Sequence, residues 1–103
     1  MSKFKVYTAE TANSNGTSLK GYIKANYNQL LSLLGEPTYD TPSGDNKVQK
    51  EWVVGFKGEI FTIYDWKTYN EFETMNSLNE FNVGGTTNAS EFIEFIEKSI
   101  KNN

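Results

Sequence analysis

The chain has 103 residues, of which 37% are hydrophobic and 15% aromatic, enough for one core built largely around rings. It contains no cysteine, histidine or arginine, and its net charge is −3. The missing side chains exclude disulfides, thiolate or imidazole metal sites, and nucleophiles activated by histidine. Without arginine, and with a negative net charge, we expect no nucleic-acid binding.

The amino-terminal residues MSKFKVYTAE carry no long apolar run, and no other segment approaches the length of a membrane span. We therefore expect a cytoplasmic protein with no membrane partner. The chain length and the absence of an inter-domain linker predict a single α+β domain over residues 1–103.

Residues 3–9 and 17–24 each alternate between apolar and polar side chains, which predicts two half-buried strands. The pair Asn15-Gly16 lies between them and is a strong turn signal, so we predict that the two strands form a hairpin. In the second strand, one face is expected to carry Leu19, Gly21 and Ile23, and the other face Lys20, Tyr22 and Lys24.

Two amphipathic helices are predicted from capping residues and apolar spacing. Asn26 and Gln29 fit a capping box before a helix that ends at Gly35. Asn88 and Glu91 form a second capping-box pair before a carboxy-terminal helix. The apolar faces are expected to comprise Tyr27, Leu30, Leu31 and Leu34 in the first helix, and Phe92, Ile93, Phe95, Ile96 and Ile100 in the second.

Residues 51–56 and 59–66 are apolar runs separated by Lys57-Gly58, a pattern typical of a hairpin with a two-residue turn. Both faces of this hairpin carry apolar side chains, so we expect it near the centre of the sheet. Residues 78–83 predict a short further strand. The element order β-β-α-β-β-β-α predicts an α+β fold: a twisted antiparallel sheet of about five strands with two amphipathic helices on one face.

In the stretch FTIYDWK, alternation separates Ile63 from Tyr64 and Trp66. Because two helices cover only one face of the sheet, we expect the second face to be rich in aromatic rings, with Tyr22 among them and Lys67 beside them. Such a face can bind a planar ligand by stacking, contact a second subunit, or form part of the core. The sequence leaves these three interpretations open, and we expect a homo-oligomer.

A second candidate site is the segment VGGTTNASE, residues 83–91, which leads into the last helix. Glycines and free backbone N–H groups at a helix start attract anions, which makes Gly84, Gly85, Thr86 and Thr87 candidate ligand-binding residues. A plain loop is the simpler explanation, because the segment lacks the lysine of a phosphate-binding P-loop.

Acid–base chemistry would have to rely on carboxylates such as Asp45, Glu51 and Asp65, because the chain has no histidine. Nothing in the sequence holds two of these acids together. The spacing of Asp40 and Asp45 also fits no calcium-binding loop. We therefore expect no enzymatic activity, no catalytic residue, no metal site and no cofactor.

Several motifs resemble those of a mostly uncharacterised family of small bacteriophage proteins: TSLKGYIKANYNQLLSLLGEP, KVQKEWVV, FTIYDWK and FNVGG. The resemblance covers residues 17–85. It departs from the family pattern at Phe81, where the family usually has tryptophan, and in a shortened segment before that residue. The resemblance implies a phage accessory protein in the host cell cytoplasm. Small phage proteins without catalytic residues often act against host defence.

We therefore consider two functions. The first is a non-enzymatic anti-defence protein that sequesters a small nucleotide-like immune signal, a nucleotide sponge. Its aromatic residues, Tyr64 and Trp66 among them, would stack on the base, and Lys20, Lys67 and residues 84–87 would hold phosphate. The alternative is a protein–protein inhibitor of a host defence protein that uses an acidic surface. The candidate acids for that surface are Glu71, Glu73, Glu80, Glu91, Glu94 and Glu97.

Overall fold

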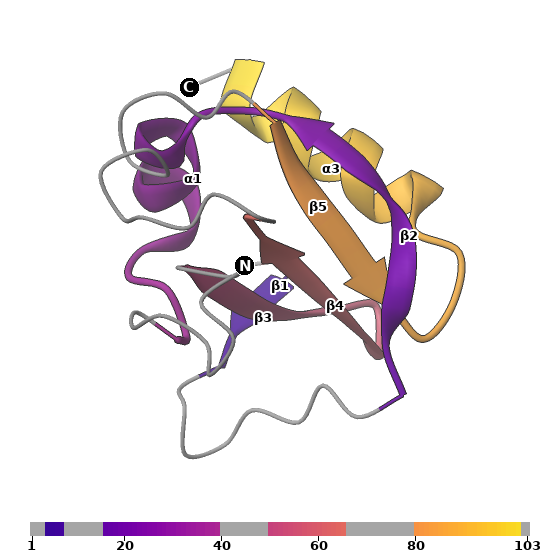
Figure 1. Ribbon diagram of the computed structural model, residues 1–103. Coiled ribbons are helices and arrows are strands. Elements are labelled where there is room, and N and C mark those ends of the chain that lie inside the picture. Colours follow the sequence, from indigo (N-terminus) through magenta and orange to yellow (C-terminus); the bar gives the residue numbers. More distant parts are fainter. Residues whose placement is uncertain (1–3, 8–15, 40–49, 66–79, 102–103) are drawn as a thin grey trace.

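The computed structural model describes residues 4–7, 16–39, 50–65 and 80–101 (Figure 1). The fold is α+β, and its strands and helices follow the predicted order. The elements are β1 (Phe4–Val6), β2 (Ser18–Lys24), α1 (Tyr27–Leu34), β3 (Glu51–Phe56), β4 (Glu59–Tyr64), β5 (Glu80–Gly85) and α3 (Ser90–Lys101). Among the described residues, no helix is both long enough and apolar enough to cross a membrane.

The five strands form one antiparallel sheet in the order β1-β3-β4-β5-β2. The predicted hairpin of β3 and β4 is confirmed, and both strands lie inside the sheet. Lys57 and Gly58 form its turn with φ angles of 52° and 81°. Two central residues with positive φ match the right-handed twist of the flanking strands.

The predicted hairpin between the first two strands is wrong. β1 pairs with β3, and β2 pairs with β5, so the two strands lie at opposite edges of the sheet. Gly16 does lie in a turn and has a φ of 85°. A turn signal is local, however, and does not determine which strand the following residues pair with. In this protein each amino-terminal strand pairs instead with a strand from the second half of the chain.

One residue of β2 also departs from the predicted alternation. The pairing with β5 shifts between Leu19 and Gly21, so that Lys20 is an extra residue on the β2 side. Such a bulge moves the side chains of the preceding residues to the opposite face of the sheet. Leu19 therefore does not share the buried face of Ile23, and its side chain is 50% exposed.

The first helix begins and ends as predicted. The side chain of Asn26 accepts a hydrogen bond from the Gln29 backbone N–H at 2.8 Å, and the Gln29 side chain accepts one from the Asn26 N–H at 3.0 Å. Gly35 follows the helix with a φ of 84° and donates its N–H to the carbonyl of Leu31.

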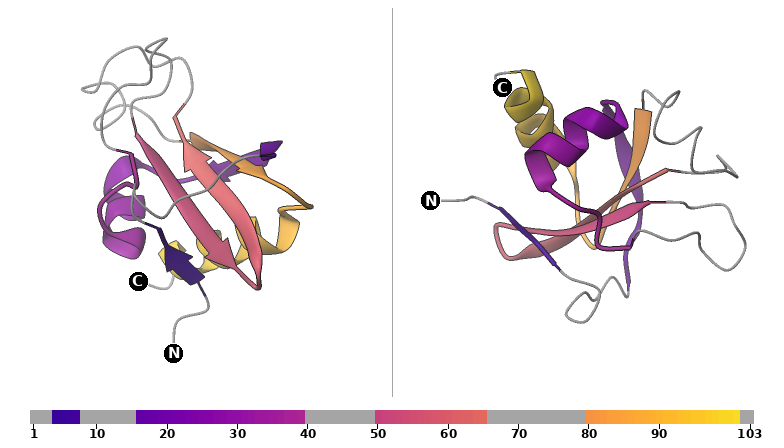
Figure 2. Two further views of the ribbon diagram at one scale, coloured as in Figure 1. Left: turned by 90° about the horizontal axis from the view of Figure 1, so that it is seen from below. Right: turned by 90° about the vertical axis from the view of Figure 1, so that its left-hand side faces the viewer.

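The second helix begins at Ser90, and its start differs in one detail from the prediction. Asn88 accepts the backbone N–H of Ser90 at 2.9 Å. The Glu91 carboxylate does not complete a capping box but pairs with Lys57 in the β3–β4 turn. Both helices lie on the same side of the sheet, as expected (Figure 2).

The core fills the space between the sheet and the helices. Trp52 lies at its centre with no exposed surface, 5.9 Å from the ring of Tyr27 and 6.0 Å from that of Phe81. Its indole N–H donates to the carbonyl of Gly35 at 2.9 Å. A second group of rings joins the sheet to α3, with Phe61 stacked on Phe92 at 4.5 Å.

Ile63 is fully buried on the helix side of β4, and its replacement tests this description of the core. Ile63→Ala should leave a cavity and lower the free energy of unfolding by about 2–5 kcal/mol. The matched control is Leu19→Ala, which truncates a half-exposed aliphatic side chain and should change stability by less than about 0.5 kcal/mol. Urea unfolding of both variants measures the difference. Similar losses in the two variants would contradict the assignment of the two faces.

Candidate functional site

Four side chains lie in a line across the face of the sheet opposite the helices. Glu51 on β3 is directly opposite Tyr64 on β4, Tyr64 is opposite Asn82 on β5, and Asn82 is opposite Tyr22 on β2. Residues that face each other on neighbouring strands point to the same side of a sheet. We call these four residues the cross-strand row.

The cross-strand row faces away from the helices, because residues next to its members on β3, β4 and β5 belong to the core. Trp52, Ile63 and Phe81 are each fully buried in the cluster that includes α1 and α3. Side chains alternate along a strand, so their neighbours Glu51, Tyr64 and Asn82 must face away from the helices.

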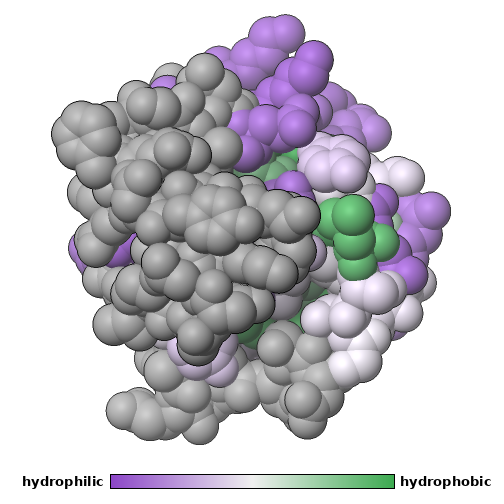
Figure 3. Space-filling model, viewed as in Figure 1, coloured by the Kyte–Doolittle hydropathy of each residue, from purple (hydrophilic) through white to green (hydrophobic). Residues whose placement is uncertain are grey.

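The Tyr22 end of the row is open to solvent. Figure 3 shows apolar surface reaching solvent on this side of the molecule, and the exposed large side chains here include Leu19 and Tyr22, at 50% and 53%. Lys20 and Lys24 are exposed on either side of Tyr22 along β2. The Tyr22 end therefore combines a half-exposed aromatic ring with two nearby ammonium groups.

The middle of the row is more enclosed. Tyr64 is partly buried, and its hydroxyl is hydrogen-bonded to the side chain of Asn82. Burial raises the pKa of Tyr64; the hydrogen bond from Asn82 opposes this shift, whereas the nearby groups of Glu51 and Tyr22 add to it. The Tyr64 hydroxyl is therefore neutral at physiological pH.

Glu51 closes the other end of the row. Loss of hydration on burial raises the pKa of its carboxyl, and the negative charge of Asp65 raises it further. Within the described ranges, no residue donates a hydrogen bond to the Glu51 carboxylate, although its backbone is paired with Tyr39 and Tyr64. The row thus ends in a partly dehydrated acceptor.

The glycines of the predicted anion loop at residues 84–87 belong to β5. Gly84 and Gly85 are both buried in the sheet. A Cβ at Gly84 would lie 2.6 Å from the Thr62 Oγ1, and one at Gly85 would lie 2.8 Å from the Phe61 ring. The missing side chains at Gly84 and Gly85 make room for Thr62 and Phe61.

The two threonines of that segment lie away from the row. Thr86 and Thr87 are exposed and follow the end of β5, whereas Asn82 lies near its start. The Thr86 hydroxyl contacts the Glu59 carboxylate at 3.4 Å. The structure therefore brings Tyr22 and Tyr64 together, but not with Thr86 and Thr87.

Two of the predicted binding residues, Trp66 and Lys67, lie outside the described residues, as does the candidate acid Asp45. Asp65 is described, and it is fully buried. Its carboxylate accepts the backbone N–H of Lys50 at 2.8 Å, while its own N–H donates to the Lys50 carbonyl at 3.4 Å. Asp65 thus continues the pairing of β3 with β4 beyond Tyr64.

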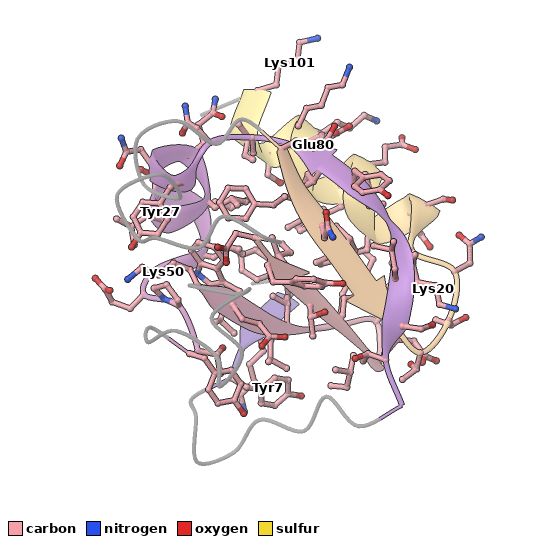
Figure 4. All side chains as sticks on the ribbon, viewed as in Figure 1. Tyr7, Lys20, Tyr27, Lys50, Glu80 and Lys101 are labelled. Carbon is pink, nitrogen blue, oxygen red and sulfur yellow. The ribbon has the colours of Figure 1, made fainter. Side chains whose placement is uncertain are left out.

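Tyr7 shares this face of the sheet but is not part of the row. Its ring lies over Gly55, where a Cβ would be 2.9 Å from the tyrosine hydroxyl, and the Lys5 ammonium is 5.2 Å from the ring centre. It borders a hollow of about 300 Å³ beside the β3–β4 turn. Figure 4 shows Tyr7 at one end of the sheet and Glu80 at the other.

The described acids of α3 lie among lysines: Glu94 and Glu97 line one hollow together with Lys98 and Lys101. Glu91 pairs with Lys57, Glu94 pairs with Lys98 at 3.3 Å, and Glu97 accepts the backbone N–H of Lys24 at 3.0 Å. Glu80 is opposite Lys24 on the sheet. Glu71 and Glu73 lie outside the described residues. Each described acid therefore has a positive or N–H group of this chain nearby.

Sequence reasoning did not identify Asn82 as a site residue and considered Glu51 only as a possible acid catalyst. Alternation placed Asn82 away from Phe81, which is correct. The register that sets Asn82 between two tyrosines was not available from the sequence, because it depends on pairing between distant strands.

No known protein family, curated protein or solved structure matches this chain. Within the described part of the chain, no group of three acidic side chains is placed to hold a metal ion. The chemistry of the row is that of stacking and hydrogen bonding.

The raised pKa of Glu51 predicts a pH-dependent effect of Glu51→Gln. The folded state holds the proton more tightly than the unfolded state, so wild-type stability declines as pH rises from about 4.5, the ordinary pKa of a glutamate, through the raised pKa of the folded state. Glutamine does not titrate. The variant should therefore be more stable than wild type near neutral pH, and this advantage should shrink towards about pH 4. Urea unfolding of both proteins between about pH 4 and neutral pH measures this stability difference. An equal advantage at the two pH values would show that the Glu51 charge is not its cause.

The close contact of Gly84 with Thr62 predicts coupling between these positions. Gly84→Ala should destabilise the protein by about 1–3 kcal/mol, because the new methyl group collides with the Thr62 side chain. In a Thr62→Ala background the same change should cost less, since the colliding oxygen is gone. A double-mutant cycle from urea unfolding measures the coupling, and an unchanged cost would show that another contact excludes side chains at this position.

Proposed function

We propose that this protein is a non-enzymatic binding protein that captures a small nucleotide-like ligand on the cross-strand row. The observation that carries the proposal is the half-exposed ring of Tyr22 beside the hydrogen-bonded pair of Asn82 and Tyr64. An exposed aromatic ring on an antiparallel sheet offers a stacking surface to a nucleobase, and adjacent polar groups can bind the edge of the base.

Two exposed lysines support the ligand class. Lys20 and Lys24 flank Tyr22, so a phosphate attached to a base stacked on that ring would meet positive charge. This proposal assigns the phosphate to Lys20 and Lys24 rather than to residues 84–87. The net charge of −3 opposes binding of a long nucleic acid, whose many phosphates would be repelled, and favours a small ligand.

The biological role follows from the resemblance to small phage proteins. If the chain acts in an infected cell, capture of a nucleotide signal would deprive a host defence enzyme of its activator. The alternative, inhibition of a defence protein through an acidic surface, receives less support because the described acids have partners within this chain.

Tyr22 provides the test of ligand capture. A panel of nucleotides, including cyclic and ADP-ribose-type members, is screened by thermal shift; a ligand at a hundred times its dissociation constant should stabilise the protein by about 2.7 kcal/mol. Tyr22→Ala should weaken binding at least about tenfold through lost stacking, whereas Tyr22→Phe should retain it. Leu19→Ala is the matched control, because it truncates an equally exposed side chain of the same strand.

The outcomes distinguish ligand capture from a contact between copies of this chain. No shift with any member of the panel, or equal binding by Tyr22→Ala, contradicts the proposal. Size-exclusion chromatography of the same variants adds a second readout. An oligomer that dissociates in Tyr22→Ala, with no ligand bound by the wild type, would identify the row as a contact between copies of this chain.

A further inference from the structure

β2 lies at the edge of the sheet, with β5 on one side and no described strand on the other (Figure 1). Most of its residues are exposed: Ser18, Leu19, Lys20, Tyr22 and Lys24. Outward-pointing backbone groups of an edge strand can pair with a strand of another chain unless the protein blocks them. The surroundings of these groups in β2 therefore decide whether copies of this chain can join their sheets.

The helix α3 lies against this edge strand (Figure 1). Gly21 allows the close approach, because a Cβ at this position would lie 2.8 Å from Cδ1 of Ile93 in α3. Glu97 follows Ile93 by four residues and therefore lies on the same face of the helix. Its carboxylate accepts a hydrogen bond from the backbone N–H of Lys24 at 3.0 Å. A side chain of α3 thus reaches the backbone of the edge strand.

Glu97 occupies one of the few positions at which another strand could pair with β2. The Lys24 N–H points away from β5, since it donates to α3. Backbone groups alternate along a strand, so the Tyr22 N–H points the same way. The bulge at Lys20 limits the regular part of this edge to residues 21–24, which leaves these two outward N–H groups. An incoming strand would bring its carbonyl oxygen to the position of the carboxylate, which takes the donor and repels that oxygen.

We propose that Glu97 blocks the outer edge of β2 and so prevents the sheet from pairing with the sheet of a second copy of this chain. A second copy fits such an edge, because two identical strands can pair antiparallel about a two-fold axis. That pairing would have to break the hydrogen bond between Glu97 and Lys24 in both copies. The inference concerns self-association and does not depend on the proposed function.

Sedimentation velocity over a range of protein concentrations tests this role. Glu97→Ala should form a species of about twice the wild-type mass and should associate at least about tenfold more tightly, because no charge-assisted hydrogen bond has to be broken. Glu97→Gln should remain close to the wild type, since the glutamine side-chain oxygen still accepts the N–H. Glu94→Ala is the matched control, because it truncates a carboxylate of the same helix that pairs with Lys98 at 3.3 Å.

Amide hydrogen exchange shows whether the association uses this edge. In Glu97→Ala the Tyr22 amide should exchange more slowly as the protein concentration rises, because a partner strand covers it. Wild-type behaviour of Glu97→Ala, or equally strong association of Glu94→Ala or Glu97→Gln, would overturn the inference. An associated form of Glu97→Ala in which the Tyr22 amide stays unprotected would overturn it as well. Each of these results leaves nucleotide capture by the wild type to its own test.

Discussion

The position of Trp52 decides which side chains of β3 lie on the face of the sheet opposite the helices. Its indole fills the centre of the core, and its N–H donates to the carbonyl of Gly35, so one side chain fixes the end of α1 against the sheet. Because side chains alternate along a strand, burial of Trp52 forces Glu51 and Val53 to the opposite face. The acceptor at the end of the cross-strand row is therefore placed by the largest hydrophobic side chain next to it.

The segment after α1 reinforces this placement. Thr38 is buried; its hydroxyl accepts the backbone N–H of Val53 at 2.9 Å and donates to the carbonyl of Tyr7 at 2.6 Å. Tyr39 then forms a bridge with Glu51 through two backbone hydrogen bonds. A single threonine thus links three segments of the chain. The cross-strand row is therefore held by backbone hydrogen bonds at its Glu51 end, and its half-exposed ring lies at the Tyr22 end.

Local interactions were readable from the sequence, and long-range pairing was not. The capping box of Asn26 and Gln29 and the turn at Lys57-Gly58 depend on residues within a few positions of each other, so their side-chain chemistry identifies them directly. Alternation also assigned Tyr64 to the correct face. The partner of β2, the bulge at Lys20 and the inclusion of Gly84 in β5 all depend on a strand far away in the chain. Sequence reasoning therefore named two members of the row as ligand residues but could not align them with Glu51 and Asn82.

The pairing of both amino-terminal strands with later strands has a consequence for how the chain is made. Ser18 is opposite Gly85, and Phe4 is opposite Phe56, so neither strand has a partner while the first half of the protein leaves the ribosome. The hairpin of β3 and β4 is the earliest part of the sheet that can close over a short loop. Folding should then wait for β5, after which β2 can dock, and this dominance of distant contacts predicts slow folding for a chain of this length. Until synthesis is complete, the apolar side chains of β2 and α1 remain without their core, which favours chaperone contact during translation.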